Sequence, residues 1–182
     1  MKKVLMPLAP GFEEIEALAV VDILRRAGAE VVTAGTVDGP IQGRNAIKVL
    51  ADKALDEALT EGFDVIVLPG GADGTNHLKE DARIIKALHG FSSQGKIIAA
   101  ICAAPTVLSA AGLTEGRRIT SHPGVRTELA REKISDERVV IDGNIVTSQG
   151  PGTAMEFAFC LVTMLFGEKK AQEVNSGVLA RL

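Results

Sequence analysis

The stretch KIIAAICAAPTVLSA at residues 96–110 decides the fold class of this chain. Residues 96–100 are a short apolar run typical of a buried strand, and residues 104–110 are predicted to form a helix. Cys102 lies between them, where the chain must turn sharply from the expected strand into the expected helix. A strand followed directly by a helix is the repeating unit of a parallel sheet covered by helices.

The rest of the chain repeats this alternation of strand-like and helix-like patterns. Strands are predicted at residues 3–8, 30–34, 64–68, 118–120, 139–141 and 145–147, a hairpin or extended excursion at 41–50, and helices at 13–27, 81–88, 153–166 and 168–175. His89 and Gly90 are expected to end the second helix, and Thr153 and Glu156 to form a capping box. We therefore predict one α/β domain over residues 1–182, with a doubly wound, mostly parallel sheet between helices.

Composition argues against several classes of partner. Twenty Lys and Arg residues against 23 Asp and Glu give a net charge of −3, and no basic stripe is present to bind duplex DNA. The chain has no Trp or Tyr and six Phe, so it lacks the stacking platforms of single-strand binders. Prolines and acidic residues interrupt the apolar N-terminus, and Pro105 interrupts the longest apolar run. We expect no nucleic-acid partner, no membrane segment and no signal peptide, and a cytoplasmic location with two free thiols.

Cys102 is the sharpest candidate for a reactive residue. Its place at a strand-to-helix elbow would push the side chain out of the sheet, and the helix N-terminus would favour the thiolate. A buried core cysteine remains the alternative, because that is the commonest fate of a free thiol. Cys160 lies in the apolar run FAFCLV and is interpreted as inert packing.

Helical geometry predicts that Glu16 points inward. At 100° per residue it shares a face with Val20 and Ile23, whereas Glu14 marks the exposed face. Burial would raise the pKa of this carboxyl group, so that it could donate a proton to a neighbouring thiolate or substrate oxygen. The alternative is a capping carboxylate in the first turn, a role that suits Glu13 and Glu14 better. We favour the functional interpretation because buried carboxylates cluster at active sites.

Two further features follow expected strands. The pair Gly70-Gly71 lacks Cβ atoms, so its N–H groups could approach a ligand oxygen as an oxyanion hole requires, although a tight turn explains the pair equally well. His122 precedes Pro123, which restricts its backbone and could hold the ring near Cys102. No zinc-ligand spacing and no phosphate-binding glycine loop is found, so we expect neither a metal nor a cofactor.

Taken together, these motifs resemble the ThiJ/PfpI superfamily, in the branch of the parkinsonism-associated protein deglycase and its bacterial ThiJ-type relatives. The resemblance covers nearly the whole chain and rests on GFEEIE at 11–16, LPGG at 68–71, AAICAAP at 99–105 and TSQGPGT at 147–153. It implies a flavodoxin-like fold and a homodimer. It also implies that Cys102 is the reactive cysteine, Glu16 its carboxylic partner and His122 the nearby histidine, with an oxyanion pocket at the N–H groups of Gly71 and Ala103.

Two departures narrow the expected activity. Ala103 stands where the protease branch of the superfamily has a histidine, and His122 is followed by Pro123 and Gly124, unlike the His-x-Glu of related glutamine amidotransferases. We therefore expect a cofactor-independent glyoxalase or deglycase that acts on methylglyoxal, a small reactive carbonyl, or on its adducts, with a protective role in oxidative stress. The alternative is a non-enzymatic redox sensor or chaperone in which Cys102 is oxidised to a sulfinate.

Overall fold

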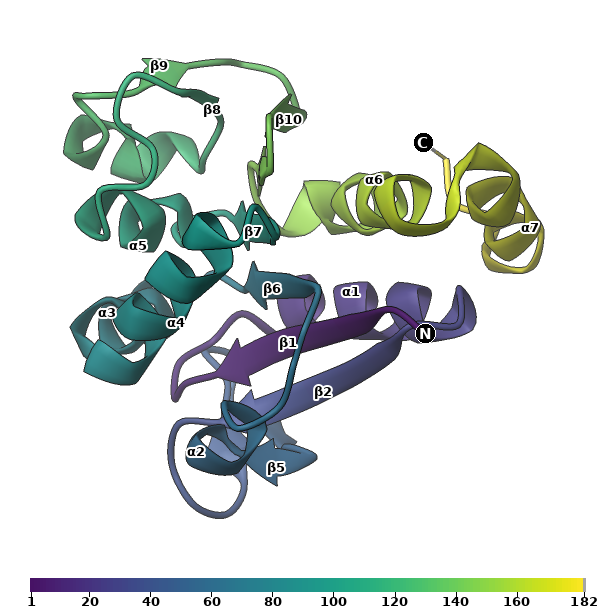
Figure 1. Ribbon diagram of the computed structural model, residues 1–182, viewed down its shortest axis with the longest axis horizontal. Coiled ribbons are helices and arrows are strands. Elements are labelled where there is room, and N and C mark those ends of the chain that lie inside the picture. The colour runs from purple at the N-terminus through teal and green to yellow at the C-terminus, as the bar shows by residue number, and fades with distance from the viewer. Residues whose placement is uncertain (182) are drawn as a thin grey trace.

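A seven-stranded sheet forms the centre of the computed structural model, which describes residues 1–181 (Figure 1). Its strand order is β10-β11-β7-β6-β1-β2-β5, and all neighbouring strands are parallel except β10 and β11. The strands of this sheet are β1 (Lys3–Leu8), β2 (Glu30–Gly35), β5 (Lys53–Ala54), β6 (Val65–Leu68), β7 (Ile97–Ile101), β10 (Val139–Asp142) and β11 (Ile145–Ser148).

Helices cover both faces of the sheet because alternate side chains of each strand point to opposite sides. One core contains Val4 and Met6 together with α1 (Glu14–Arg26), α6 (Ala154–Phe166) and α7 (Glu168–Val178). The other core contains Leu5 of the same strand together with α2 (Leu55–Ala58), α3 (Ala72–Glu80), α4 (Ala82–Ser93) and α5 (Pro105–Ala110). This arrangement confirms the predicted doubly wound, flavodoxin-like α/β class.

Two small two-stranded sheets lie outside the central one. The first is an antiparallel hairpin of β3 (Ile41–Gln42) and β4 (Lys48–Val49), in the segment where a hairpin or an excursion was expected. The second pairs β8 (Arg118–Ile119) with β9 (Lys133–Ile134), and the 3-10 turns η1 (Pro123–Glu128) and η2 (Pro151–Thr153) complete the chain. Among the helices within residues 1–181, none has both the length and the apolar character needed to cross a bilayer.

The structure differs from the predicted helices in two places. No helix was predicted at residues 72–80, but they form α3, in which Gly74 packs against the Phe12 backbone and Leu78 enters the core. The helix predicted to stop at His89 continues to Ser93, so His89 lies inside α4. Burial of Phe91 explains the extra turn, because tertiary packing outweighs the low helix propensity of Gly90.

The predicted capping box at the start of α6 is also wrong. The Thr153 hydroxyl accepts a hydrogen bond from the Gly150 N–H at 3.1 Å, so it serves the preceding turn instead of the helix. The Glu156 carboxylate does not reach back to the helix start, since it accepts a hydrogen bond from Arg138 Nε at 2.6 Å.

Candidate active site

Cys102 stands at a strained turn between β7 and α5. Its φ angle is +66°, a left-handed conformation that few residues other than glycine adopt. Two backbone hydrogen bonds hold it there: the Cys102 N–H donates to the Ser148 carbonyl at 2.9 Å, and the His122 N–H donates to the Cys102 carbonyl at 2.8 Å. The residue is 7% exposed. Backbone strain held by surrounding structure is typical of functional sites.

Glu16 lies in the first turn of α1 and is fully buried, as the helical geometry predicted. Its Oε2 atom accepts a hydrogen bond from the Gly70 N–H at 2.8 Å. Its Oε1 atom has no hydrogen-bond partner of regular geometry within residues 1–181, and the carboxyl group faces the Cys102 thiol. The capping role belongs to Glu13, whose Oε2 accepts the Glu16 N–H at 2.8 Å.

The two glycines after β6 allow this close approach. A Cβ atom on Gly70 would lie 2.5 Å from Glu16 Oε2 and 2.7 Å from Cys102 Cβ. Gly71 has a φ angle of +90°, and a Cβ atom there would overlap the Gly11 carbonyl oxygen. The N–H groups of Gly71 and Ala103 donate toward the Cys102 sulfur. A side chain at either glycine position would therefore disturb the site directly.

Burial governs the protonation of the pair. It raises the pKa of Glu16 to about 7. Burial, followed by the neighbouring Glu16 carboxylate, raises the pKa of Cys102 to about 12, although the N–H groups of Gly71 and Ala103 act in the opposite direction. We had expected the helix N-terminus to favour the thiolate, but its effect is smaller than that of burial, and the net result is a raised pKa of Cys102. α5 has only six residues and cannot offset the burial.

The two groups titrate as one coupled unit. Above pH 7 and below the second pKa the pair holds a single proton. If that proton moves from Cys102 Sγ to the Glu16 carboxylate, the site gains a nucleophilic thiolate beside a proton donor without any change in net charge. The N–H groups of Gly71 and Ala103 stabilise this arrangement, because they point at the sulfur that carries the charge.

His122 is hydrogen-bonded to Cys102 through its backbone. The side chain is exposed, and Nδ1 accepts a hydrogen bond from the Gly124 N–H at 3.1 Å. Within residues 1–181 the ring makes no hydrogen bond to Cys102 or Glu16. The structure thus brings the backbone of His122 into contact with Cys102.

Glu14 corrects the helical-wheel prediction of an exposed side chain. It is 3% exposed, and its carboxylate accepts hydrogen bonds from Asn45 N at 2.8 Å, Asn45 Nδ2 at 3.0 Å and Ile47 N at 3.4 Å. Burial alone would raise the pKa of Glu14, but these hydrogen bonds hold it below its usual value. Glu14 therefore joins the β3–β4 hairpin to the start of α1. A helical wheel cannot find this contact, because the partner is a distant loop.

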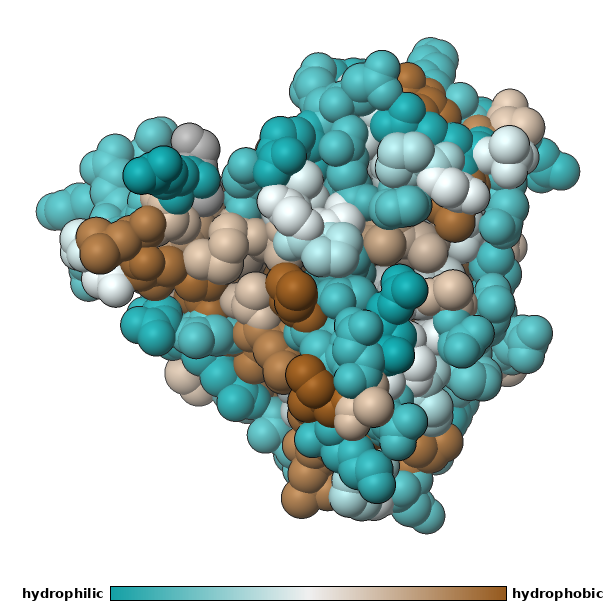
Figure 2. All heavy atoms as spheres, turned by 180° about the vertical axis from the view of Figure 1, so that it is seen from behind, coloured by the Kyte–Doolittle hydropathy of each residue, from teal (hydrophilic) through white to brown (hydrophobic). Residues whose placement is uncertain are grey.

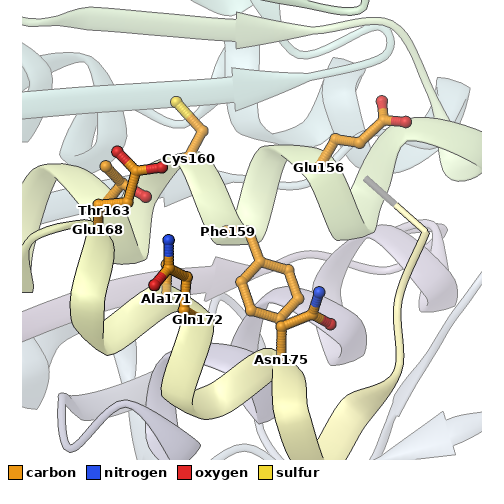
Figure 3. Close-up of a pocket in the computed structure, with 8 residues that line it drawn as sticks. All are labelled: Glu156, Phe159, Cys160, Thr163, Glu168, Ala171, Gln172 and Asn175. Atoms are coloured by element: carbon orange, nitrogen blue, oxygen red, sulfur yellow. The ribbon is translucent and has the colours of Figure 1, made fainter.

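Cys160 lies on α6, where it lines a cavity of about 280 Å³ between α6 and α7 (Figure 3). It is partly exposed, so its prediction as a fully packed core residue is only partly met. Burial raises the pKa of its thiol, and no charged group contributes to that shift. Within the described residues, no group of three His, Cys, Asp or Glu side chains could hold a metal ion.

A parallel sheet with a strained cysteine after a central strand, set against a buried carboxyl group, defines a flavodoxin-like protein of the nucleophile-elbow type. The family model described as the DJ-1/PfpI family matches residues 2–164, and the chain belongs to this family.

Individual relatives agree with the family model. Protein dj-1beta of Drosophila melanogaster is 42% identical over 181 residues, which cover 98% of this chain and 97% of that protein. The crystal structure of Drosophila melanogaster DJ-1beta superposes with a TM-score of 0.97 at 41% identity and covers 100% of this chain and 99% of that one.

Two other relatives carry functional descriptions. The glutathione-independent glyoxalase DJR-1.2 of Caenorhabditis elegans is 37% identical over 164 residues, which cover 89% of this chain and 87% of that protein. A structure described as Toxoplasma gondii DJ-1, oxidized, has a TM-score of 0.96 at 36% identity over 100% of both chains.

Proposed function

We propose that this protein is a cofactor-independent glyoxalase or deglycase that uses Cys102 as its nucleophile and protects the cell from reactive carbonyls. The observation that carries the proposal is the buried Glu16 carboxyl group, which faces a strained cysteine at the end of β7. The relative named as a glutathione-independent glyoxalase supports the same class of substrate.

The proposed reaction begins with addition of the Cys102 thiolate to the aldehyde carbon of methylglyoxal, while Glu16 gives its proton to the aldehyde oxygen. The product of this step is a hemithioacetal. The ionised Glu16 then takes the proton from the former aldehyde carbon, which gives an enediolate, and returns it to the neighbouring carbon, while the proton of the hemithioacetal hydroxyl passes to the former ketone oxygen. The former aldehyde carbon is thereby oxidised to a thioester and the ketone carbon is reduced to an alcohol.

Water completes the cycle. It attacks the thioester, the carbon–sulfur bond breaks, and lactate leaves with one proton while Cys102 is regenerated. The sum is methylglyoxal plus water giving lactate and a proton, with no external oxidant or reductant. The N–H groups of Gly71 and Ala103 are placed to stabilise the oxyanion that forms beside the sulfur. His122 is proposed to pass protons to solvent, because its exposed ring stands on a loop tied to Cys102.

The same addition step accommodates a deglycase. A hemithioacetal or aminocarbinol adduct of methylglyoxal would transfer its carbonyl fragment to Cys102 and release the free thiol or amine. The two activities differ only in whether the carbonyl arrives free or as an adduct.

Turnover of methylglyoxal to lactate tests the proposal. Cys102→Ala should abolish activity, whereas Cys160→Ala should retain it, because Cys160 lies in α6 and no hydrogen bond or pKa effect links it to Glu16 or Cys102. Glu16→Gln and Glu16→Asp should both reduce kcat, since the first removes the proton carrier and the second withdraws the carboxyl group by one methylene. Activity of Cys102→Ala equal to that of the unmodified protein would refute the enzymatic role.

A second candidate function is redox sensing through oxidation of Cys102 to a sulfinate. The relative described as oxidized favours it. A purely redox role predicts peroxide modification of Cys102 without any Cys102-dependent turnover of methylglyoxal.

Association as a homodimer is part of the proposal. Among the exposed large hydrophobic residues, four lie on α1 or in the segment of the β3–β4 hairpin: Ile15 at 56%, Leu18 at 38%, Ile47 at 53% and Leu50 at 72%. The hydrogen bond from Ile47 N to Glu14 places the β3–β4 hairpin beside the start of α1. Ile15 and Leu18 on α1 and Ile47 in the hairpin therefore lie on neighbouring parts of the surface. Figure 2 shows hydrophobic residues gathered in a band across one face. We propose that a second copy covers this surface, in the cytoplasm, where both thiols stay reduced.

A further inference from the structure

A cavity of about 580 Å³ lies between the β3–β4 hairpin and α3. Its volume falls in the range of small-molecule sites. Gln42, Gly43 and Arg44 line it from the hairpin, and α3 contributes Asp73, Asn76, His77 and Glu80. The sequence patterns assigned no role to any of these residues.

Backbone contacts link the wall of the cavity to the surroundings of the reactive cysteine. Gly11 forms part of its wall, and the Gly11 carbonyl oxygen lies against Gly71, where a Cβ atom would overlap it. The Gly71 N–H in turn faces the Cys102 sulfur. Gly71 therefore lies between Gly11, in the wall of the cavity, and the sulfur atom of Cys102.

The backbone around Arg44 is held firmly. Its N–H donates to the Phe12 carbonyl at 2.9 Å, and the Gly11 N–H donates to the Gln42 carbonyl at 2.8 Å. Gly43 sits against the buried Glu14 carboxylate so closely that a Cβ atom would overlap it. The hairpin thus fixes the position from which the Arg44 side chain reaches the cavity.

The Arg44 guanidinium is a cation without a counter-ion inside the protein. It makes no ion pair within residues 1–181, whereas seven other arginines do: Arg25, Arg26, Arg83, Arg117, Arg118, Arg126 and Arg138. Its charge also lowers the pKa of Glu16, so it acts on the catalytic pair. A free guanidinium of this kind matches a carboxylate in charge and geometry.

The wall of the cavity opposite Arg44 carries a carboxylate, that of Asp73. Asp73 stands in the first turn of α3 beside Gly11, and its Cβ would lie 2.7 Å from a Cβ placed on Gly11. A carboxylate accepts hydrogen bonds only, so it suits a hydroxyl donor and repels a second anion. A ligand that carries a carboxylate toward Arg44 and a hydroxyl toward Asp73 satisfies both walls.

We propose that this cavity binds a small 2-hydroxycarboxylate as the exit site for the reaction product, with Arg44 holding the carboxylate and Asp73 accepting a hydrogen bond from the hydroxyl group. The assignment rests on the proposed glyoxalase function, whose product is such an acid. The reaction converts a neutral carbonyl compound into an anion, and Arg44 draws that anion away from the buried, acidic Glu16.

Binding of D-lactate, measured by titration calorimetry on the full-length protein, tests the site without any need for turnover. Lactamide lacks the charge and propionate lacks the hydroxyl, so the two serve as matched ligands. We expect Arg44→Gln to weaken D-lactate binding about tenfold or more and to leave lactamide binding unchanged. Arg44→Lys should restore part of the affinity, and Asp73→Asn should reduce the preference for D-lactate over propionate.

Arg131→Gln is the control variant, because Arg131 is exposed and lines a different cavity. Absence of D-lactate binding to the unmodified protein, or equal binding to Arg44→Gln, would overturn the proposal. Methylglyoxal turnover measured on the same samples separates the two ideas. Turnover with Arg44-independent lactate binding refutes only the exit site, and Arg44-dependent binding without turnover refutes only the glyoxalase function.

Discussion

Glu16 and Cys102 meet across Gly70, which has room for no side chain. The carboxyl group accepts the Gly70 N–H at 2.8 Å, and a methyl group on Gly70 would lie 2.7 Å from Cys102 Cβ. The acid and the thiol come from α1 and from the end of β7, and only the bare backbone of Gly70 fits between them.

Gly70→Ala should therefore damage both the site and the fold. Overpacking in a buried site costs about 1–3 kcal/mol, so we expect a loss of unfolding free energy of that size together with loss of methylglyoxal turnover. Gly90→Ala is the matched control, since a Cβ atom on Gly90 meets nothing within 4 Å and the residue lies inside α4. It should stabilise the protein by about 0.5–1 kcal/mol. Urea unfolding measures both effects, and a neutral Gly70→Ala would contradict the described packing.

Alkylation of Cys102 should depend on the ionisation of Glu16. The coupled pair loses its first proton at about pH 7, so the rate of reaction with iodoacetamide should rise through that pH. In Glu16→Gln this step should disappear, because the glutamine has no proton to lose. The rates are measured between pH 5 and 9 in a Cys160→Ala background, which leaves a single thiol. If the rise in alkylation rate near pH 7 persists in Glu16→Gln, it comes from the ionisation of a group other than Glu16.

Stability should fall between pH 4.5 and pH 7 through Glu16. Its pKa is about 7 in the folded protein and 4.5 in the reference state, so the folded state binds the proton more tightly. The stabilisation is complete below pH 4.5 and is lost as pH rises through 7, a change of about 3 kcal/mol. The difference in unfolding free energy between the unmodified protein and Glu16→Gln isolates this effect. From pH 5 to pH 7.5 we expect the unmodified protein to lose unfolding free energy relative to Glu16→Gln. A difference that stays constant over this range would contradict a raised pKa of Glu16.

Peroxide should oxidise Cys102 before Cys160. Two molecules of hydrogen peroxide would each deliver one oxygen to the Cys102 sulfur and leave as water, which gives a sulfinate. The N–H groups of Gly71 and Ala103 and a protonated Glu16 can hydrogen-bond to that sulfinate, whereas no hydrogen-bond donor lowers the pKa of the Cys160 thiol. Peptide mass spectrometry after graded peroxide should show +32 Da on the Cys102 peptide, from the masses of two oxygens (~16 Da each). Earlier oxidation of Cys160 would show that the reactive thiol is assigned wrongly.

A charge on the exposed hydrophobic surface should dissociate the proposed dimer. Leu18→Glu places a carboxylate on α1 in the middle of that surface, and sedimentation at micromolar concentration should then show a 19.1 kDa monomer. Ile141→Glu is the control, since Ile141 is 48% exposed on β10 at the far edge of the sheet. If the dimer survives Leu18→Glu but not Ile141→Glu, the interface lies at the β10 edge of the sheet instead of at α1.

The sequence alone determined the architecture and two of the site residues. Short continuous apolar runs and helical patterns alternate along the chain, and both are local properties, so the parallel sheet and its helical layers were predictable. Cys102 was identifiable because the strand and the helix that flank it are adjacent in sequence. The inward direction of Glu16 followed from the geometry of a single helix.

Only the tertiary structure decided how those residues interact. Gly70 is 54 residues from Glu16, and Asn45 is 31 residues from Glu14, and neither pairing leaves a periodic trace in the sequence. For the same reason the burial of Glu14 and the helix at residues 72–80 differed from expectation. The protonation of Cys102 depends on desolvation and on a carboxylate brought from another helix, and these forces act through space, whereas sequence patterns report neighbours along the chain.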